Sequence, residues 1–223
     1  MPLPTNTHFL RLAAWIFLVF FGLPLAAQQA DGWVLKNEKD AVKVYYRKTS
    51  GIYELKLATS MKVPLSGIVQ LFDEVSKYPV WGYKVTEARL LKRVSPTEIY
   101  YYSKIDFPWP MNDRDIVLHT KLEQDLKNHA VYSVSTAAPD YIPEVKDVVR
   151  IRQAKSKWTM VPGAGGWLYV EYYLNSDPAG NIPDWAINLA LDVGPRETIK
   201  RMREILKEPF YQNSKLAHIK EKE

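Results

Sequence analysis

The sequence predicts an α+β fold that combines a mainly antiparallel sheet with one early helix and one long C-terminal helix. Three observations predict it. Runs of β-branched and aromatic residues alternate with turn residues, an early segment repeats apolar residues every three or four positions, and Pro183 opens a long helical segment. The 223 residues are 47% hydrophobic and 13% aromatic, which is enough for one domain with a real core. This composition excludes a disordered, collagen-like or coiled-coil chain.

Residues 1–27 have the layout of a secretory signal peptide. Arg11 precedes an apolar run over residues 12–27, and no other charged residue stands before Asp31. A positive start, a short apolar middle and small residues at the cleavage point are typical of such signals. The run is shorter than the roughly 20 residues that cross a bilayer, and a proline interrupts it. We therefore expect cleavage near Ala27 and export to the periplasm or the extracellular space, with an uncleaved anchor as the alternative.

The first elements expected after the signal are a hairpin and an amphipathic helix. Residues 42–47 and 53–61 are strand-like, with turn residues at 49–51 between them. Pro64 then opens a helix with one apolar face. That face consists of Leu65, Ile68, Val69, Phe72 and Val75. Because helical dihedrals are disfavoured in a residue that precedes proline, we expect this helix to end at residues 77–78.

Six further strands are expected before the C-terminal helix, with a turn spacing that suits hairpin connections. The strand candidates are residues 85–94, 97–105, 114–124, 129–137, 148–158 and 167–174. Residues 163–166 are rich in glycine, but they join two strands and no helix follows them. We therefore interpret them as a hairpin turn and not as a phosphate-binding loop.

Pro183 opens the last helical segment, from Asp184 to Leu206. Gly194–Pro195 interrupts this segment and is expected to kink or split it. The residues from Lys207 onward are polar and are expected to fray. With no internal repeat and no linker, the sequence predicts one domain over residues 28–210 and a flexible tail at 211–223.

Alternation with a period of two predicts which strand residues face inward. In residues 114–122 the even positions are largely apolar, whereas Asp115, His119 and Lys121 lie on the odd face. The expected inner residues are Ile99, Tyr101, Ser103, Ile105, Ile116, Leu118, Thr120, Leu122, Leu168, Val170, Tyr172 and Leu174. Hydroxyls among aliphatic residues suit a ligand cavity, although an ordinary half-buried sheet also tolerates Thr and Tyr.

Composition and motifs exclude several function classes. A chain without cysteine has no disulfide scaffold, thiolate nucleophile or Cys-ligated zinc. It also lacks a G-x-S-x-G elbow, a P-loop and an H-E-x-x-H motif, and its four histidines are too scattered to bind a metal. The net charge of +5 is mild for a nucleic-acid binder. We expect no metal, no cofactor and no nucleic-acid partner.

Two charged clusters have alternative interpretations. His119 shares a strand with Asp115 and Asp125, but on the face away from the apolar side, which disfavours acid–base catalysis. The basic residues within 150–157 would suit anionic lipid headgroups, whereas a solvated sheet face is the simpler interpretation.

A series of motifs resembles one known family. The first motifs of the series are residues 78–81 (Tyr-Pro-Val-Trp), 97–102 (Thr-Glu-Ile-Tyr-Tyr-Tyr) and 107–115. The third motif contains a Pro-x-x-x-x-Arg-Asp stretch, in which Trp109–Pro110 departs from the usual residues. The later members are Ser135, Pro139, Pro143, Val149–Arg150, Gly166–Trp167, residues 177–185, Asn188 and Pro195. As an ordered series across residues 42–206, they resemble the steroidogenic acute regulatory protein-related lipid transfer (START) domain.

The resemblance implies a helix-grip fold, in which a curved antiparallel sheet wraps around the long C-terminal α-helix and encloses a hydrophobic cavity. It also implies that residues 139–146 form a movable lid and that the helix from Trp185 onward forms one cavity wall. The implied ligand-binding residues are Tyr101, Ile105, Arg114, Ile116, Leu118, Thr120, Val134, Val170, Tyr172, Trp185 and Leu189. For Arg114 a structural ion pair or carbonyl bond is the alternative to a headgroup contact.

The resulting hypothesis is an exported, monomeric, non-enzymatic carrier or binder of one lipid or sterol-like molecule, with transient contact to membrane surfaces. One alternative is an enzyme of the same superfamily acting on an aromatic or polyketide-like substrate, which would need an inward His, Asp or Glu beside the cavity. Another is a sensor, which would need an exposed apolar patch away from the cavity mouth.

Overall fold

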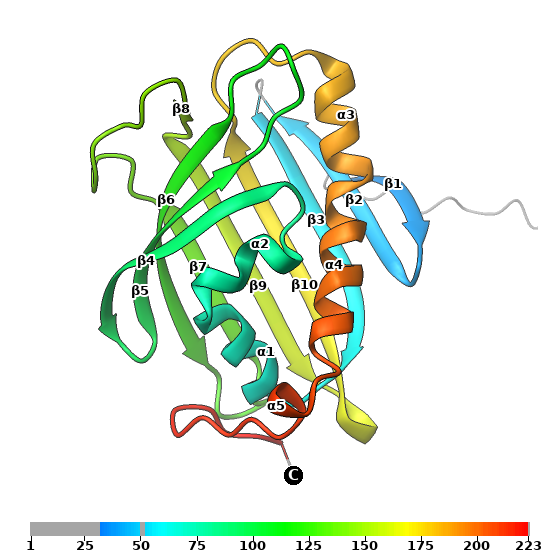
Figure 1. The fold of residues 1–223 in the computed structure, drawn as a ribbon. Helices are drawn as coiled ribbons and strands as arrows, with labels where there is room; N and C mark the ends of the chain where they lie inside the picture. Colours follow the sequence, from blue (N-terminus) through cyan, green and yellow to red (C-terminus); the bar gives the residue numbers. More distant parts are fainter. Residues whose placement is uncertain (1–31, 50–51, 223) are drawn as a thin grey trace, which may run out of the picture.

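In a computed structural model, which describes residues 32–49 and 52–222, the strands form one curved antiparallel sheet in the order β1-β2-β3-β10-β9-β7-β6-β5-β4 (Figure 1). β8 pairs with β6 in parallel. The strands are β1 (Val34–Lys39), β2 (Val42–Thr49), β3 (Ile52–Lys62), β4 (Val85–Ser95), β5 (Glu98–Ile105), β6 (Arg114–Gln124), β7 (Val131–Ala137), β8 (Val149–Arg150), β9 (Gln153–Pro162) and β10 (Trp167–Asp177). The helices are α1 (Leu65–Asp73), η1 (Val75–Lys77), α2 (Tyr78–Trp81), η2 (Ala164–Gly166), α3 (Asp184–Asp192), α4 (Gly194–Ile205) and α5 (Pro209–Gln212). The expected signal peptide at residues 1–27 lies outside the described residues, as do Ser50 and Gly51 of the first turn.

The strands agree with the sequence prediction except at two places. β1 was not expected, because its residues are exposed or half-buried and show no clear alternation of polarity. The strand expected over residues 148–158 is wrong, because the chain breaks at Ile151–Arg152 into β8 and β9. β8 runs beside β6, whereas β9 crosses to lie between β7 and β10.

The early helix ends sooner than expected. α1 stops at Asp73, since Glu74 has a non-helical ψ of 63°. Pro79 does not terminate a helix; it lies in the first turn of α2. Proline suits that position, because the N–H it lacks would have no partner within the helix there.

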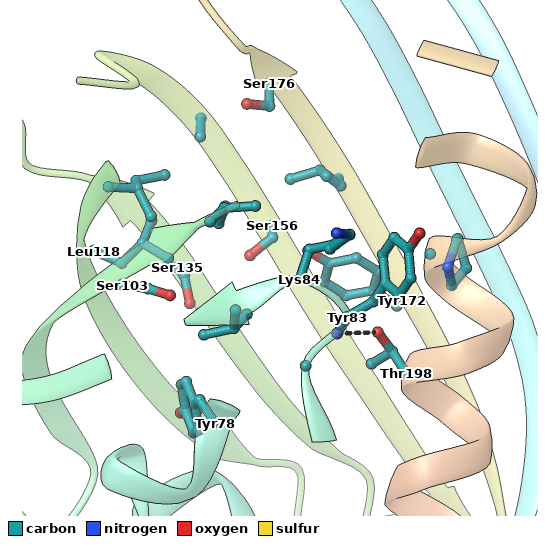
Figure 2. Close-up of a pocket in the computed structure, with 18 of the residues that line it drawn as sticks. Tyr78, Tyr83, Lys84, Ser103, Leu118, Ser135, Ser156, Tyr172, Ser176 and Thr198 are labelled. Atoms are coloured by element: carbon teal, nitrogen blue, oxygen red, sulfur yellow. Dashed lines mark hydrogen bonds between the residues drawn. The ribbon is translucent and has the colours of Figure 1, made fainter. Parts of the chain in front are cut away.

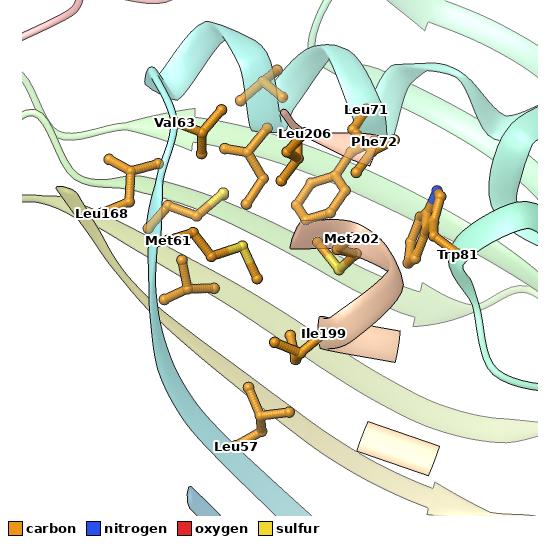
Figure 3. Packing of buried hydrophobic residues seen from close by; sticks show 14 of the residues in the cluster. Leu57, Met61, Val63, Leu71, Phe72, Trp81, Leu168, Ile199, Met202 and Leu206 are labelled. Atoms are coloured by element: carbon orange, nitrogen blue, oxygen red, sulfur yellow. The ribbon is translucent and has the colours of Figure 1, made fainter. Parts of the chain in front are cut away.

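The C-terminal helix is split as predicted. α3 ends at Asp192, and α4 begins at Gly194 with a proline in its first turn. Ile199 and Met202 of α4 are fully buried and pack among residues of α1, β3 and β10 (Figure 3). This packing forms the dry core at the end of the sheet that α1 and α5 cover (Figure 1).

The expectation of a frayed C-terminal tail is wrong. Tyr211 and Ile219 are buried in the core, and the absence of a Cβ on Gly67 lets α1 lie against the Tyr211 carbonyl. The Glu221 carboxylate accepts the backbone N–H groups of Leu65, at 3.0 Å, and of Ser66, at 2.7 Å. α1 has no side-chain cap of its own, so this anion satisfies its free N–H donors.

A buried ion pair lies on the outer face of the sheet, where the sequence favoured a solvated face over a site for anionic headgroups. Asp115 and Arg150 have side chains that are 0% and 1% exposed, and two hydrogen bonds of 2.7 and 3.0 Å join them. The other Arg150 donors bind the carbonyls of Pro139, Ile142 and Pro143. Each charge is therefore paired, and the loop after β7 is tied to the outside of β6.

We expect Asp115→Ala to lower the free energy of unfolding by about 3–5 kcal/mol, because it leaves the buried Arg150 charge without its partner. Asp140→Ala is the control, since it breaks an exposed pair with Arg152 and should change stability little. Urea unfolding of both variants measures the difference. Equal losses in the two variants would contradict a stabilising role specific to the buried pair.

Candidate ligand-binding cavity

A cavity of about 580 Å³ lies between the inner face of the sheet and helices α2, α3 and α4 (Figure 2). Sites for a single small ligand measure roughly 300–1,000 Å³, so this space suits one guest molecule. Strands β5, β6, β7, β9 and β10 supply most of the sheet residues of the wall, and α4 contributes Pro195 and Thr198.

The structure places most of the predicted ligand-binding residues on this wall. They are Tyr101, Ile105, Ile116, Leu118, Thr120, Tyr172 and Leu189. Alternation thus assigned the inner faces of β5 and β6 correctly, because their two faces differ clearly in polarity. Contact of these side chains with a ligand stays a prediction.

Val134 and Val170 do not line the cavity. In β7 the inward residues are Ser133 and Ser135, which puts Val134 on the opposite face. Taking the more hydrophobic residues of β7 as the inward ones gives the wrong face, because the side chains that face the cavity are the small polar ones. Val170 faces inward as expected, but it is fully buried in the dry core.

Trp185 is also absent from the wall, and its side chain is 51% exposed. It lies in the first turn of α3 (Asp184–Asp192), whose cavity side carries Ala186, Ile187 and Ala190. The sequence pattern at the start of this helix did not indicate which way the Trp185 side chain points.

Arg114 has the structural role that was weighed as the alternative. Its buried guanidinium donates to the carbonyls of Asn112 at 2.5 Å, Ala179 at 3.1 Å and Pro178 at 3.3 Å. It also lies 4.3 Å from the centre of the Phe107 ring. Arg114 therefore joins the β5–β6 loop to the β10–α3 loop and does not line the cavity.

Residues 139–146, expected as a lid, lie on the outer face, where Arg150 binds their carbonyls and Tyr141 stacks on Tyr100 at 4.4 Å. The connection after α2 lines the cavity instead. Its Tyr83 N–H donates to Thr198 of α4 at 3.1 Å (Figure 2). The Lys84 carbonyl accepts the Asp106 N–H at 2.8 Å.

The charged residues of the wall lie at its rim. Asp73, Lys84 and Asp106 have side chains that are 40%, 46% and 40% exposed. Lys84 pairs with Asp106, and Asp73 lies 2.7 Å from Arg93. These are the charged members of the wall within the described residues, and neither a histidine nor a glutamate belongs to it.

Inside the rim, the polar side chains of the described wall are neutral: they are hydroxyls and the indoles of Trp81 and Trp158. Burial raises the pKa of the Tyr101 phenol, although the neighbouring Ser135 and Thr120 hydroxyls oppose this shift. Burial also raises the pKa of Tyr172 to about 12, opposed by Ser156. Both phenols therefore stay protonated at physiological pH and can donate hydrogen bonds.

Sequence reasoning placed Tyr101 and Tyr172 on the wall but missed the aromatic residues that pack against them. Phe72 lies 5.2 Å from Trp158, Trp158 lies 4.4 Å from Tyr172, and Tyr78 lies 5.3 Å from Tyr101, each between ring centres. One signal was present, because Trp158 alternates in β9 with residues such as Lys157 that face water.

Within residues 32–49 and 52–222, no group of three His, Cys, Asp or Glu residues could hold a metal ion. No helix in this part of the chain is long and apolar enough to cross a membrane.

The START domain family model matches residues 23–210. The chain belongs to the START domain family. An uncharacterised protein of Pseudomonas aeruginosa is 31% identical over 176 residues, which cover 78% of this chain and 86% of that protein. The phosphatidylcholine transfer protein of Mus musculus is 26% identical over 178 residues, covering 76% of this chain and 81% of that protein.

The fold of this START domain agrees with a solved relative. The crystal structure of a STAR-related lipid transfer protein fragment from Xanthomonas axonopodis superimposes with a TM-score of 0.73 at 33% identity, covering 80% of this chain and 100% of the other. The expected helix-grip fold is confirmed.

We expect the stability of this START domain to fall at high pH. Because folding raises the pKa of Tyr172 from about 10 to about 12, the unfolded chain loses this proton first as pH rises. The stability that this raised pKa of Tyr172 contributes is fully present below pH 10. It is lost as pH rises through 12, with a slope of about 1.4 kcal/mol per pH unit.

Urea unfolding from pH 9 to 12 of the wild type and Tyr172→Phe measures this effect. The variant should lose stability less steeply above pH 10. Parallel curves would show that folding does not raise the pKa of Tyr172.

Proposed function

We propose that this START domain binds one hydrophobic lipid in its cavity and carries it through water without catalysis. The observation that carries the proposal is an apolar cavity of about 580 Å³ whose charged residues lie at the rim. The names of two relatives, phosphatidylcholine transfer protein and STAR-related lipid transfer protein, support lipid as the cargo.

The energetics of transfer favour such a cavity. Removing a methylene from water gains about 0.8 kcal/mol, so enclosing ten of them gains about 8 kcal/mol before ordering costs. The same free energy keeps a lipid in its bilayer. A protein that keeps the chain enclosed removes most of the cost of crossing an aqueous compartment.

The wall chemistry supports carriage over catalysis. The carboxylates on it, Asp73 and Asp106, are paired at the rim with Arg93 and Lys84. The hydroxyls inside have no neighbouring histidine or carboxylate base within the described wall to activate them. The side chains that meet a guest there orient it through hydrogen bonds and contact its apolar body.

We propose further that the carrier is exported and works as a monomer that touches membrane surfaces transiently. Arg11 and the apolar run over residues 12–27 support export. The net charge of +5 favours weak, salt-dependent contact with anionic surfaces. The mass of the protein recovered from the periplasm or the medium tests cleavage near Ala27.

Native mass spectrometry of the purified protein tests lipid binding directly. We expect a single lipid to copurify with one copy of the chain. An empty protein that converts a small aromatic compound would overturn the carrier and support the enzyme alternative.

Ser103→Trp should abolish lipid uptake, because Ser103 lines the cavity and an indole there fills the space of the guest. Lys155→Trp is the matched control, since Lys155 is exposed in β9 outside the cavity. Transfer of a fluorescent lipid between vesicles measures the effect. Uptake by Ser103→Trp at the level of the control would show that the lipid binds elsewhere.

A further inference from the structure

We infer that the polar end of the lipid buried in this cavity is uncharged, so that the ligand class is a neutral lipid such as an acylglycerol, a fatty alcohol or a sterol. The inference rests on the proposed function and narrows it. It depends on which polar groups lie deep in the cavity and which lie at its rim.

A continuous row of hydroxyls crosses the inner face of the sheet. Thr120 of β6 pairs in register with Ser135 of β7, and Ser135 pairs with Ser156 of β9. The Thr120 and Ser135 side-chain oxygens lie 2.7 Å apart. We call Thr120, Ser135 and Ser156 the hydroxyl row; Figure 2 shows Ser135 and Ser156 on their strands.

Two phenols extend the hydroxyl row toward neighbouring strands. Tyr101 lies beside the hydroxyls of Thr120 and Ser135, and Tyr172 lies beside that of Ser156. Because hydroxyls both donate and accept, this group can bind either a hydroxyl or a carbonyl of a guest.

Two further hydroxyls lie at different levels of the sheet: Ser133 is two residues along β7 from Ser135, whereas Ser103 of β5 pairs with Ile116, four residues along β6 from Thr120. Ser103 and Ser133 line the cavity and are 6% and 5% exposed. Within the described part of the chain, neither side chain has a hydrogen-bond partner, and neither oxygen is sealed off from the cavity. A buried polar group normally has a partner, so the polar end of a guest beside the hydroxyl row would complete the hydrogen bonding of Ser133.

The charges of the wall are unsuited to a charged headgroup at this depth. Asp73, Lys84 and Asp106 are half-exposed, and each already has an ionic partner at the rim. A charge moved into the apolar interior without an opposite charge is strongly disfavoured. Serine hydroxyls supply hydrogen bonds but no net charge, so they satisfy a neutral polar end at much lower cost.

Lipids with the same acyl chain and different polar ends test the inference. Trp81 and Trp158 line the cavity, so quenching of tryptophan fluorescence by a 9,10-dibromostearoyl chain reports its insertion. The single-chain set is the monoacylglycerol, the free fatty acid and the lysophosphatidylcholine. The two-chain pair is the diacylglycerol and the phosphatidylcholine.

We expect the neutral member of each set to bind at least tenfold more tightly than its charged counterparts. A fatty acid or phosphocholine lipid that binds as tightly as the neutral one overturns the inference but leaves lipid carriage intact. Absence of binding by every lipid, together with no copurified lipid, overturns the proposed function itself.

Ser133→Ala tests the role of the hydroxyls. It should weaken binding of the monoacylglycerol roughly three- to tenfold, the effect of one hydrogen bond, and leave weak binding of the fatty acid unchanged. Thr136→Ala, on the exposed outer face of the same strand, is the control. If the two variants bind the monoacylglycerol equally, the hydroxyls do not select the ligand.

Circular dichroism checks that both variants fold. Ser135→Ala is the second variant, within the hydroxyl row itself, should Ser133→Ala fail to fold. The comparison of lipids on the wild-type protein tests the inference even if neither variant folds.

Discussion

The hollow between the sheet and α4 depends on side-chain size along the inner face. At the end covered by α1 and α5, large residues such as Met61, Leu168 and Met202 meet and exclude water. In the middle of the sheet the inward positions include serines such as Ser135 and Ser156, which are too short to fill the distance to the helix. Unfilled volume is destabilising. A guest that fills this volume and binds only the folded state adds its binding free energy to the stability of the domain.

Other contacts hold the wall in place from outside the cavity. The Asp115–Arg150 pair ties the loop after β7 to the back of β6, and Arg114 joins two loops beside the cavity. The C-terminal residues complete α1 through the Glu221 carboxylate. These charges are buried or placed away from the inner face. The inward positions of the sheet are therefore free of these structural ion pairs, and the cavity interior stays neutral.

This separation of charge suits a carrier. A neutral interior binds its guest through apolar contact and a few hydrogen bonds, which permit release at a membrane without a chemical step. The protonated phenols of Tyr101 and Tyr172 keep the same hydrogen-bonding character across physiological pH. Under this proposal, selection among lipids depends on the polar end, because every long acyl chain offers the same apolar surface.

The sequence alone determined the α+β class, the family resemblance, the split before Pro195 and the inner faces of β5 and β6, because each is a local pattern of polarity, turn chemistry or motif order. Tertiary structure decided the rest. The face of Val134 depends on the register of β7 with its neighbours, and the buried state of Asp115 depends on Arg150, 35 residues away. The packing of Tyr211 likewise depends on α1. Such contacts join residues distant in the chain, so no local periodicity carries them, and the size of the cavity follows from all of them together.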